Sequence, residues 1–179
     1  MTRTYVITGA ASGIGATTAQ TLREQGHTVI GVDLKDVEVT ADLSTHEGRI
    51  AAAEQAAKLA GGTVDAVIAC AGIAAPIAKT IAINFFGVTE FLTAMLPALR
   101  ASSAPRVAVV SSMASLQTVS AELVDAALAG DEDRALQIAA GLEAQGPGIG
   151  YLMYPSSKRA LSRWVRRESI SEAWAGSGI

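Results

Sequence analysis

The sequence predicts an α/β protein built on a doubly wound parallel sheet, and three observations lead to this fold class. Short runs rich in β-branched residues alternate with alanine-rich helical stretches as far as Ser112. A glycine-rich turn separates the first run from the first helical stretch. Hydrophobic residues make up 50% of the chain but aromatic residues only 4%, as expected where helices pack closely on a sheet through small aliphatic side chains. Short strand–helix–strand connections then imply parallel strands with right-handed crossovers.

Each element follows from its own pattern. Buried strands are predicted at residues 4–8, 28–33, 64–70 and 105–112, with a shorter candidate at 36–40. Helices are expected at about 13–25, 45–60, 80–101 and 150–175.

The stretch 116–148 breaks this rhythm. It has apolar residues at helical spacing, a break at Gly130-Asp131 and a stop at Gly146-Pro147-Gly148. We therefore expect one domain, 1–179, with a helical insertion at about 116–148 made of two short helices packed over the rim of the sheet.

Composition excludes several classes of function. The formal net charge is −3, and there is no basic patch for nucleic acid and no polybasic run for a membrane surface. The apolar stretch 64–78 is interrupted by Asp65 and Pro76 and is too short to span a bilayer. The N-terminus leads directly into a strand, unlike a signal peptide. With a single cysteine and two histidines, neither an intrachain disulfide nor a metal-ligand cluster is expected, and a cytoplasmic protein is the default.

A phosphate-binding turn is predicted between the first strand and the first helix. Gly9, Gly13 and Gly15 have no Cβ, so the backbone there can approach a diphosphate at the positive end of the helix dipole. Asp33 closes the second strand, where a carboxylate can accept ribose hydroxyls. A glycine-rich turn followed by an ordinary strand-end aspartate is the alternative, but strand, turn, helix, strand and acid in this order favour nucleotide binding.

Asp33 also favours NAD over NADP. A 2′-phosphate would lie against this carboxylate, and no Arg or Lys occurs at 10–12 or directly after Asp33. Lys35, two positions on, compensates only in part.

Tyr154 and Lys158 are one helical turn apart and project from the same face of the last helix. That face is either a solvated edge or a reaction site, and the local sequence leaves both open. In a reaction site, an ammonium beside a phenol stabilises the phenolate and prepares the tyrosine for proton transfer.

Taken together, the chain resembles a classical short-chain dehydrogenase/reductase across essentially its whole length. The residues that carry the resemblance are Thr8-Gly9-Ala10-Ala11-Ser12-Gly13-Ile14-Gly15, Asp42-Leu43, Ala69-Cys70-Ala71-Gly72, Asn84, Ser111-Ser112 and Tyr154-Pro155-Ser156-Ser157-Lys158. At 69–72 the family usually has Asn-Asn-Ala-Gly, whereas this chain has Ala-Cys in place of the asparagines. The long gap between Ser112 and Tyr154, with Asn84-Phe85-Phe86-Gly87, is similar to a bacterial 3α-hydroxysteroid dehydrogenase/carbonyl reductase subgroup.

The resemblance implies an NAD(P)-binding Rossmann domain over residues 1–179, incomplete at its C-terminal end, and a role for each site residue. Tyr154 would be the general acid/base, Lys158 would hold the nicotinamide ribose and favour the tyrosinate, and Ser112 would bind the substrate oxygen. Asn84 would bind a water that relays protons. The implied cofactor-binding residues are Gly9, Ser12, Gly13, Ile14, Gly15, Asp33, Leu34, Asp42, Leu43, Ala71, Gly72, Tyr154 and Lys158.

The expected function is therefore that of an NAD(H)-dependent oxidoreductase that interconverts a secondary alcohol and a ketone, such as a hydroxysteroid or another bulky carbonyl compound. One alternative is an NAD-dependent epimerase or dehydratase, although such relatives tend to have GxxGxxG rather than the GxxxGxG spacing found here. A nucleotide-binding module without catalysis is the other. The resemblance further implies a homo-oligomer, expected to be a dimer, and two more strands after the last helix, a C-terminal part that this chain is expected to lack.

Overall fold

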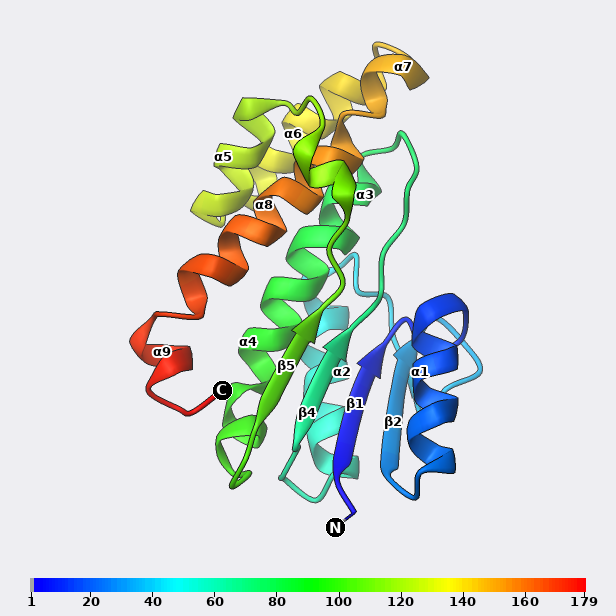
Figure 1. Cartoon of the computed structure of the whole chain (residues 1–179). Coiled ribbons are helices and arrows are strands. Elements are labelled where there is room, and N and C mark those ends of the chain that lie inside the picture. Colours follow the sequence, from blue (N-terminus) through cyan, green and yellow to red (C-terminus); the bar gives the residue numbers. More distant parts are fainter. Residues whose placement is uncertain (1) are drawn as a thin grey trace.

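A computed structural model describes residues 2–179, and its centre is a five-stranded, all-parallel sheet (Figure 1). The strand order is β3-β2-β1-β4-β5. The strands are β1 (Thr4–Thr8), β2 (Thr28–Asp33), β3 (Val39–Thr40), β4 (Ala66–Ala69) and β5 (Arg106–Val109). The α/β class with a doubly wound parallel sheet is confirmed.

Helices connect the strands and follow the last of them. They are α1 (Gly13–Glu24), α2 (His46–Leu59), α3 (Lys79–Ile81), the π-helical turn η1 (Ala82–Phe86), α4 (Gly87–Arg100), the 3₁₀ turn η2 (Met113–Leu116), α5 (Ala121–Ala129), α6 (Glu132–Glu143), α7 (Pro147–Gly150), α8 (Met153–Glu168) and α9 (Glu172–Ala175).

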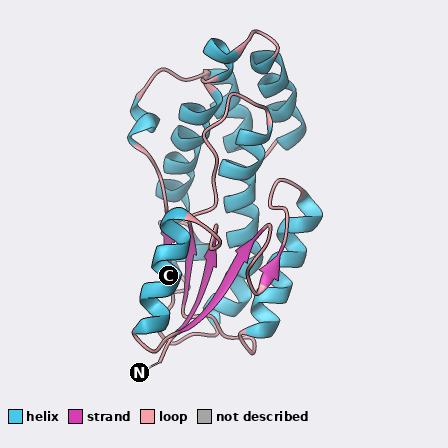
Figure 2. Cartoon of the chain, turned by 90° about the vertical axis from the view of Figure 1, so that its right-hand side faces the viewer, coloured by secondary structure: helices cyan, strands magenta, loops and turns pink. Residues whose placement is uncertain are grey.

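Helices cover both faces of the sheet, with α1 on one face and α2 and α4 on the other (Figures 1 and 2). The central strand shows why, because its successive side chains point to opposite faces. Val6 belongs to the large core beneath α2 and α4, whereas Ile7 packs with Ala19 of α1. Both strand residues are fully buried, and burial of such a side chain stabilises the fold by about 1.5–3 kcal/mol.

The strand order reverses at β1, since the chain runs outward through β2 and β3 on one side and through β4 and β5 on the other. Parallel sheets bind ligands outside the carboxyl ends of the strands at this switch point. Two hydrogen bonds fix the backbone there. The amide of Gly9 donates to the carbonyl of Val32 at 2.8 Å, and the amide of Ala71 donates to the Thr8 hydroxyl at 3.1 Å.

Some predicted boundaries were wrong for local reasons. The strand expected at 36–40 contains only Val39–Thr40, because Asp36 adopts a left-handed conformation with φ 57° that interrupts the extended chain. The last helix does not run continuously from 150 to 175 but ends at Glu168 and resumes as α9. The helix expected at 80–101 contains the π-helical turn η1.

The segment 116–148 contains two helices that meet at the predicted break. Gly130 ends α5 with φ 76°, and Asp131 caps α6 by accepting from the amide of Arg134. Both helices lie above the carboxyl ends of the strands (Figure 1). There α5 packs on α8, and α6 packs on α3 and η1. The segment therefore contacts the helices that carry Asn84 and Tyr154.

The continuous helical stretch Lys79–Arg100 is long and apolar enough to cross a bilayer by length and composition. In this fold, 72% of its most apolar window is buried, as in the core helix of a soluble protein.

Candidate active site

A cavity of about 410 Å³ lies at the carboxyl ends of the central strands; we call it the strand-end cavity. Eleven of the thirteen residues predicted to bind a cofactor line it. They are Gly9, Ser12, Gly13, Ile14, Gly15, Asp33, Leu34, Asp42, Leu43, Ala71 and Gly72. These residues are distant in sequence, and the parallel topology brings them to one edge because every contributing strand ends there.

The glycine turn is shaped so that side chains would not fit at two of its positions. A Cβ on Gly15 would lie 2.1 Å from the carbonyl oxygen of Gly9, and a Cβ on Gly9 would lie 2.8 Å from the amide nitrogen of Ala71. Gly13 differs, since it has φ +52° and a Cβ there would meet no protein atom within 4 Å. The turn therefore packs tightly on the fold while Gly13 faces open space in the cavity.

The N-terminus of α1 offers free backbone donors to this cavity. Its N-cap, Ser12, makes no side-chain capping bond, whereas Thr45, Ser120 and Asp131 cap α2, α5 and α6 with their side chains. Unpaired amide donors at the positive end of a helix are suited to an anionic diphosphate. The residues present thus fit the phosphate part of a dinucleotide.

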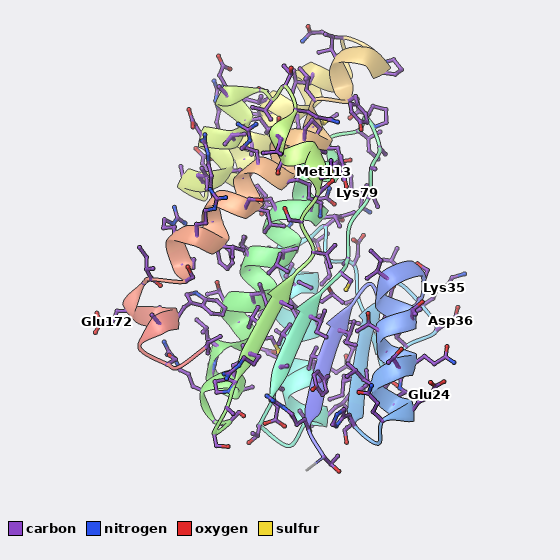
Figure 3. All side chains as sticks on the ribbon, viewed as in Figure 1. Glu24, Lys35, Asp36, Lys79, Met113 and Glu172 are labelled. Carbon is purple, nitrogen blue, oxygen red and sulfur yellow. The ribbon has the colours of Figure 1, made fainter. Side chains whose placement is uncertain are left out.

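Asp33 holds the glycine turn in place, and its carboxylate can still accept further hydrogen bonds. Its Oδ2 accepts from the amide of Ala11 at 2.9 Å, and its Oδ1 accepts from the amide of Leu34 at 2.7 Å. Each carboxylate oxygen has a second lone pair, so both can also accept from ribose hydroxyls. The nearby cation Lys35 is exposed and lies 3.9 Å from Asp36, and Figure 3 shows both at the outer edge of the molecule.

Asp42 forms an ion pair with a residue that the sequence reasoning missed. Lys79 Nζ lies 3.0 Å from Asp42 Oδ2, and both residues line the strand-end cavity. Hydrogen bonding from Ser44, together with Lys79, outweighs desolvation and lowers the pKa of Asp42 to about 2. The only sequence signal for Lys79 was its place after the carboxyl end of β4. Cys70, Ile73, Val32, Ala41 and Ile83 also line the cavity.

Lys158 lies at the edge of this cavity with donors to spare. The side chain is 5% exposed, and its ammonium donates to the carbonyl of Val110 at 2.9 Å. A Cβ on Gly72 would lie 3.7 Å from Lys158 Nζ, which places the ammonium beside the cavity wall. An ammonium has three donors, so two remain for a ligand. Burial lowers the pKa of Lys158, and the Cys70 thiol partly opposes this shift.

Tyr154 is half-buried one turn before Lys158 on α8, and it does not line the strand-end cavity. Lys158 Nζ lies 6.0 Å from the centre of its ring. The two side chains therefore share one face of the helix, as the spacing predicts, but the ammonium hydrogen-bonds to Val110 and not to the phenol.

Ser111 and Ser112 point to different sides. Ser111 Oγ lies 2.8 Å from Ser162 Oγ of α8, whereas Ser112 Oγ accepts from the amide of Ala114 at 3.1 Å and caps η2. Successive residues of an extended chain alternate in direction, so Ser112 is the one that remains available to a substrate. Within residues 2–179 no hydrogen bond joins Ser112 to Tyr154.

Asn84 is fully buried in the π-helical turn η1. Its Oδ1 accepts from the amide of Ile73 and its Nδ2 donates to the carbonyl of Ile73, both at 2.9 Å. Nδ2 also donates to Ser157 Oγ at 3.2 Å. Asn84 thus clamps the cavity wall after Gly72 to the residue before Lys158. A water relay at Asn84 stays a prediction. The water would have to bind the second lone pair of Asn84 Oδ1 or the backbone carbonyl of Asn84.

No group of His, Cys, Asp and Glu side chains within residues 2–179 is arranged to hold a metal ion.

Comparison with known proteins agrees with this arrangement. Residues 3–127 match the family model described as short chain dehydrogenase. A 3-alpha-hydroxysteroid dehydrogenase/carbonyl reductase from Comamonas testosteroni is 39% identical, over 97% of this chain and 68% of that protein.

Solved structures give the same result. The 3-alpha-hydroxysteroid dehydrogenase from Pseudomonas sp. B-0831, solved with NADH, has a TM-score of 0.88 at 39% sequence identity. The match covers 98% of this chain and 74% of that dehydrogenase chain. Menthone neomenthol reductase from Mentha piperita, at 19% identity, shares the fold with a TM-score of 0.73 and covers 94% and 85% of the two chains. The chain belongs to the short-chain dehydrogenase family of oxidoreductases.

Proposed function

We propose that this protein interconverts a secondary alcohol and a ketone with NAD(H) bound in the strand-end cavity. One observation carries the proposal: the glycine turn and Asp33 line one cavity and the buried ammonium of Lys158 lies beside its wall at Gly72, although they come from three distant parts of the chain. A bound nicotinamide cofactor supplies the hydride chemistry. The protein's own residues supply binding, orientation and the proton.

Each part of the cavity has a binding task in this proposal. The free amides at the start of α1 hold the diphosphate, and Gly13 leaves room for it. Asp33 accepts from the adenosine ribose. The two unused donors of Lys158 bind the ribose nearest the reaction centre.

NAD is preferred over NADP because Asp33 lines the strand-end cavity, whereas the cation that lines it among the described residues, Lys79, is paired with Asp42. Lys35 is exposed and does not line the cavity. A 2′-phosphate would therefore meet a carboxylate that Lys35 compensates only in part.

Proton transfer is assigned to Tyr154. Its phenol donates a proton to a ketone oxygen or accepts one from an alcohol, and the Lys158 ammonium lies 6.0 Å from the centre of its ring. The Ser112 hydroxyl orients the reacting oxygen. Asn84 acts by holding Ile73 and Ser157 in place, which fixes the helix turn that carries both Tyr154 and Lys158.

A bulky apolar substrate suits the surroundings of these residues. Met113 and Leu116, one and four residues after Ser112, are 86% and 81% exposed, and Ile149 and Tyr151, shortly before Tyr154, are also exposed. Exposed apolar side chains that gather near Ser112 and Tyr154 along the chain support an apolar substrate. Met113 lies above the strand ends, as does Lys79 (Figure 3). Hydroxysteroids are one class of this chemistry, and the Comamonas testosteroni relative carries that name.

The test is a coupled assay of secondary alcohols from 2-propanol to hydroxysteroids, with NAD and with NADP, followed by NADH absorbance. We expect turnover with NAD that rises with the apolar size of the alcohol. No turnover of any alcohol or ketone, with NADH binding intact, would reject the oxidoreductase assignment. The expected homodimer and the cytoplasmic location remain predictions, which light scattering and cell fractionation can check.

A further inference from the structure

Arg49 of α2 is fully buried and joins three parts of the chain. Its guanidinium donates to three backbone carbonyls: Nε to Leu43 at 2.9 Å, and Nη2 to Ser44 at 2.9 Å and to Ala82 at 3.3 Å. Backbone carbonyls at such a depth need a donor. Arg49 therefore supplies hydrogen-bond donors both to carbonyls of the loop that follows β3 and to the first carbonyl of η1.

Two carboxylates neutralise the buried guanidinium. Glu132 of α6 accepts from both Nη1 and Nη2 at 2.6 Å, and Glu90 of α4 accepts from Nη1 at 3.0 Å. Burial opposes the charged form, but hydrogen bonds to Glu132 and Glu90 outweigh it and raise the pKa of Arg49. The bidentate contact with Glu132 fixes the plane of the guanidinium, which a single contact does not.

The segments that Arg49 holds are walls of the strand-end cavity. Leu43 lines that cavity directly, and Ala82 precedes Ile83, which also lines it. Glu132, by contrast, lies in the first turn of α6, outside the cavity. A chain of contacts thus runs from α6 through one side chain to two walls of the nucleotide site.

We propose that Glu132, acting through Arg49, is a positioning residue that couples the segment α5–α6 to dinucleotide binding. This inference rests on the proposed function. Without the Glu132 carboxylate, the guanidinium loses its bidentate partner and turns toward Glu90, so that the carbonyls of Leu43 and Ser44 lose their donor. The Asp42–Leu43 wall then loosens. Because coupling between two sites is reciprocal, a bound dinucleotide must in turn stabilise α6.

The test compares Glu132→Gln with Asp133→Asn, since both remove one charge from the first turn of α6. Asp133 is exposed and has no hydrogen bond to Arg49 among the contacts of the described chain. NADH binding is measured by its fluorescence, and amide exchange of α6 is measured with and without NADH. We expect NADH to bind about tenfold more weakly to Glu132→Gln and within about twofold of the wild type to Asp133→Asn.

Amide exchange of α6 distinguishes a coupling role of Glu132 from a merely structural one. In the wild type and in Asp133→Asn, NADH should slow exchange in α6, and in Glu132→Gln this slowing should shrink. Glu132→Asp retains the charge and should restore most of the NADH affinity. Equal NADH affinity of Glu132→Gln and the wild type would overturn the coupling while leaving the proposed function intact. The coupling would also be overturned if NADH left the rate of amide exchange in α6 of the wild type unchanged, and this measurement needs no variant. A wild type that does not bind NADH at all would overturn the proposed function itself.

Discussion

Two cavities of nearly equal size lie in different parts of the molecule. The strand-end cavity, of about 410 Å³, is lined by glycines, Asp33, Asp42 and Lys79. A second, which we call the lateral groove, has about 400 Å³ and lies between the edge strand β5 and helices α8 and α9. Its lining is largely apolar and includes Trp164, Trp174 and Leu161.

The difference shows that volume does not identify a site in this protein. The strand-end cavity has backbone donors at the N-terminus of α1, and the buried ammonium of Lys158 lies beside its wall with two donors to spare. Such groups need a polar ligand. In the lateral groove, the rings of Trp164 and Trp174 lie 5.9 Å apart in an edge-to-face contact, which is a packing interaction. Changes at the first cavity should therefore affect the reaction, and changes at the second should affect stability.

The largest effect on turnover is expected from Tyr154→Phe. Loss of the phenol removes the proton-transfer group, so kcat should fall by about 10²- to 10⁴-fold. The NADH dissociation constant should stay within about twofold, because Tyr154 does not line the strand-end cavity. Steady-state kinetics and fluorescence titration measure the two quantities. Wild-type kcat in the variant would end the assignment of Tyr154.

Lys158→Met should lower kcat by about 100-fold while leaving the melting temperature, Tm, equal or higher. The reason is that burial lowers the pKa of Lys158 from its ordinary 10.5. The unfolded chain therefore binds this proton more tightly, and the protonated group costs stability below its folded pKa. The Tm difference between variant and wild type should narrow as pH rises toward 10.5. Calorimetry from pH 7 to pH 10 measures it, and a variant that melts well below the wild type would show that the ammonium is a stabilising group.

Asp33→Asn should change cofactor preference. Removing the carboxylate takes away an acceptor for ribose and the repulsion of a 2′-phosphate, so NAD should bind about tenfold more weakly and NADP about tenfold more tightly, roughly 1.4 kcal/mol each. Asp36→Asn is the matched control. It removes the same charge three positions on, at an exposed side chain, and Asn tolerates the left-handed backbone there. An unchanged ratio in Asp33→Asn would remove the basis for NAD preference.

Trp174→Ala should have the smallest effect on the reaction. The side chain is 6% exposed in the lateral groove, and removing such a ring costs about 3 kcal/mol of folding free energy. At about 2–4 °C per kcal/mol for a chain of this length, Tm should fall by roughly 6–12 °C. Below that temperature, NADH affinity should match the wild type. A large loss of NADH affinity in the folded variant would show that the lateral groove belongs to the binding site.

Much of the fold and of the strand-end cavity could be predicted because the information is local. Strand, glycine turn and helix follow from periodicity and from the conformational freedom of glycine, and the parallel topology then brings the strand ends together. The observed bounds of β1 and β2 agree with the predicted ones.

Long-range contacts could not be predicted in the same way. The Lys79–Asp42 pair and the Arg49–Glu132 pair join residues whose spacing has no helical or strand period. Asn84 was predicted by resemblance, but its clamp on Ile73 depends on the π-helical turn, for which the sequence has no signal. The left-handed Asp36, which shortens β3, was likewise invisible in a run that alternates like a strand.

The most direct measurement is the NADH affinity of Gly13→Ala against that of Gly26→Ala. Both glycines have positive φ, +52° and +82°, and a Cβ at either would meet no protein atom within 4 Å. Both variants therefore carry a similar backbone strain of about 1–2 kcal/mol, at opposite ends of α1. Only Gly13 lines the strand-end cavity. If that cavity holds the diphosphate, Gly13→Ala weakens NADH binding by at least tenfold while Gly26→Ala binds like the wild type. Equal NADH affinity of the two variants would contradict the account.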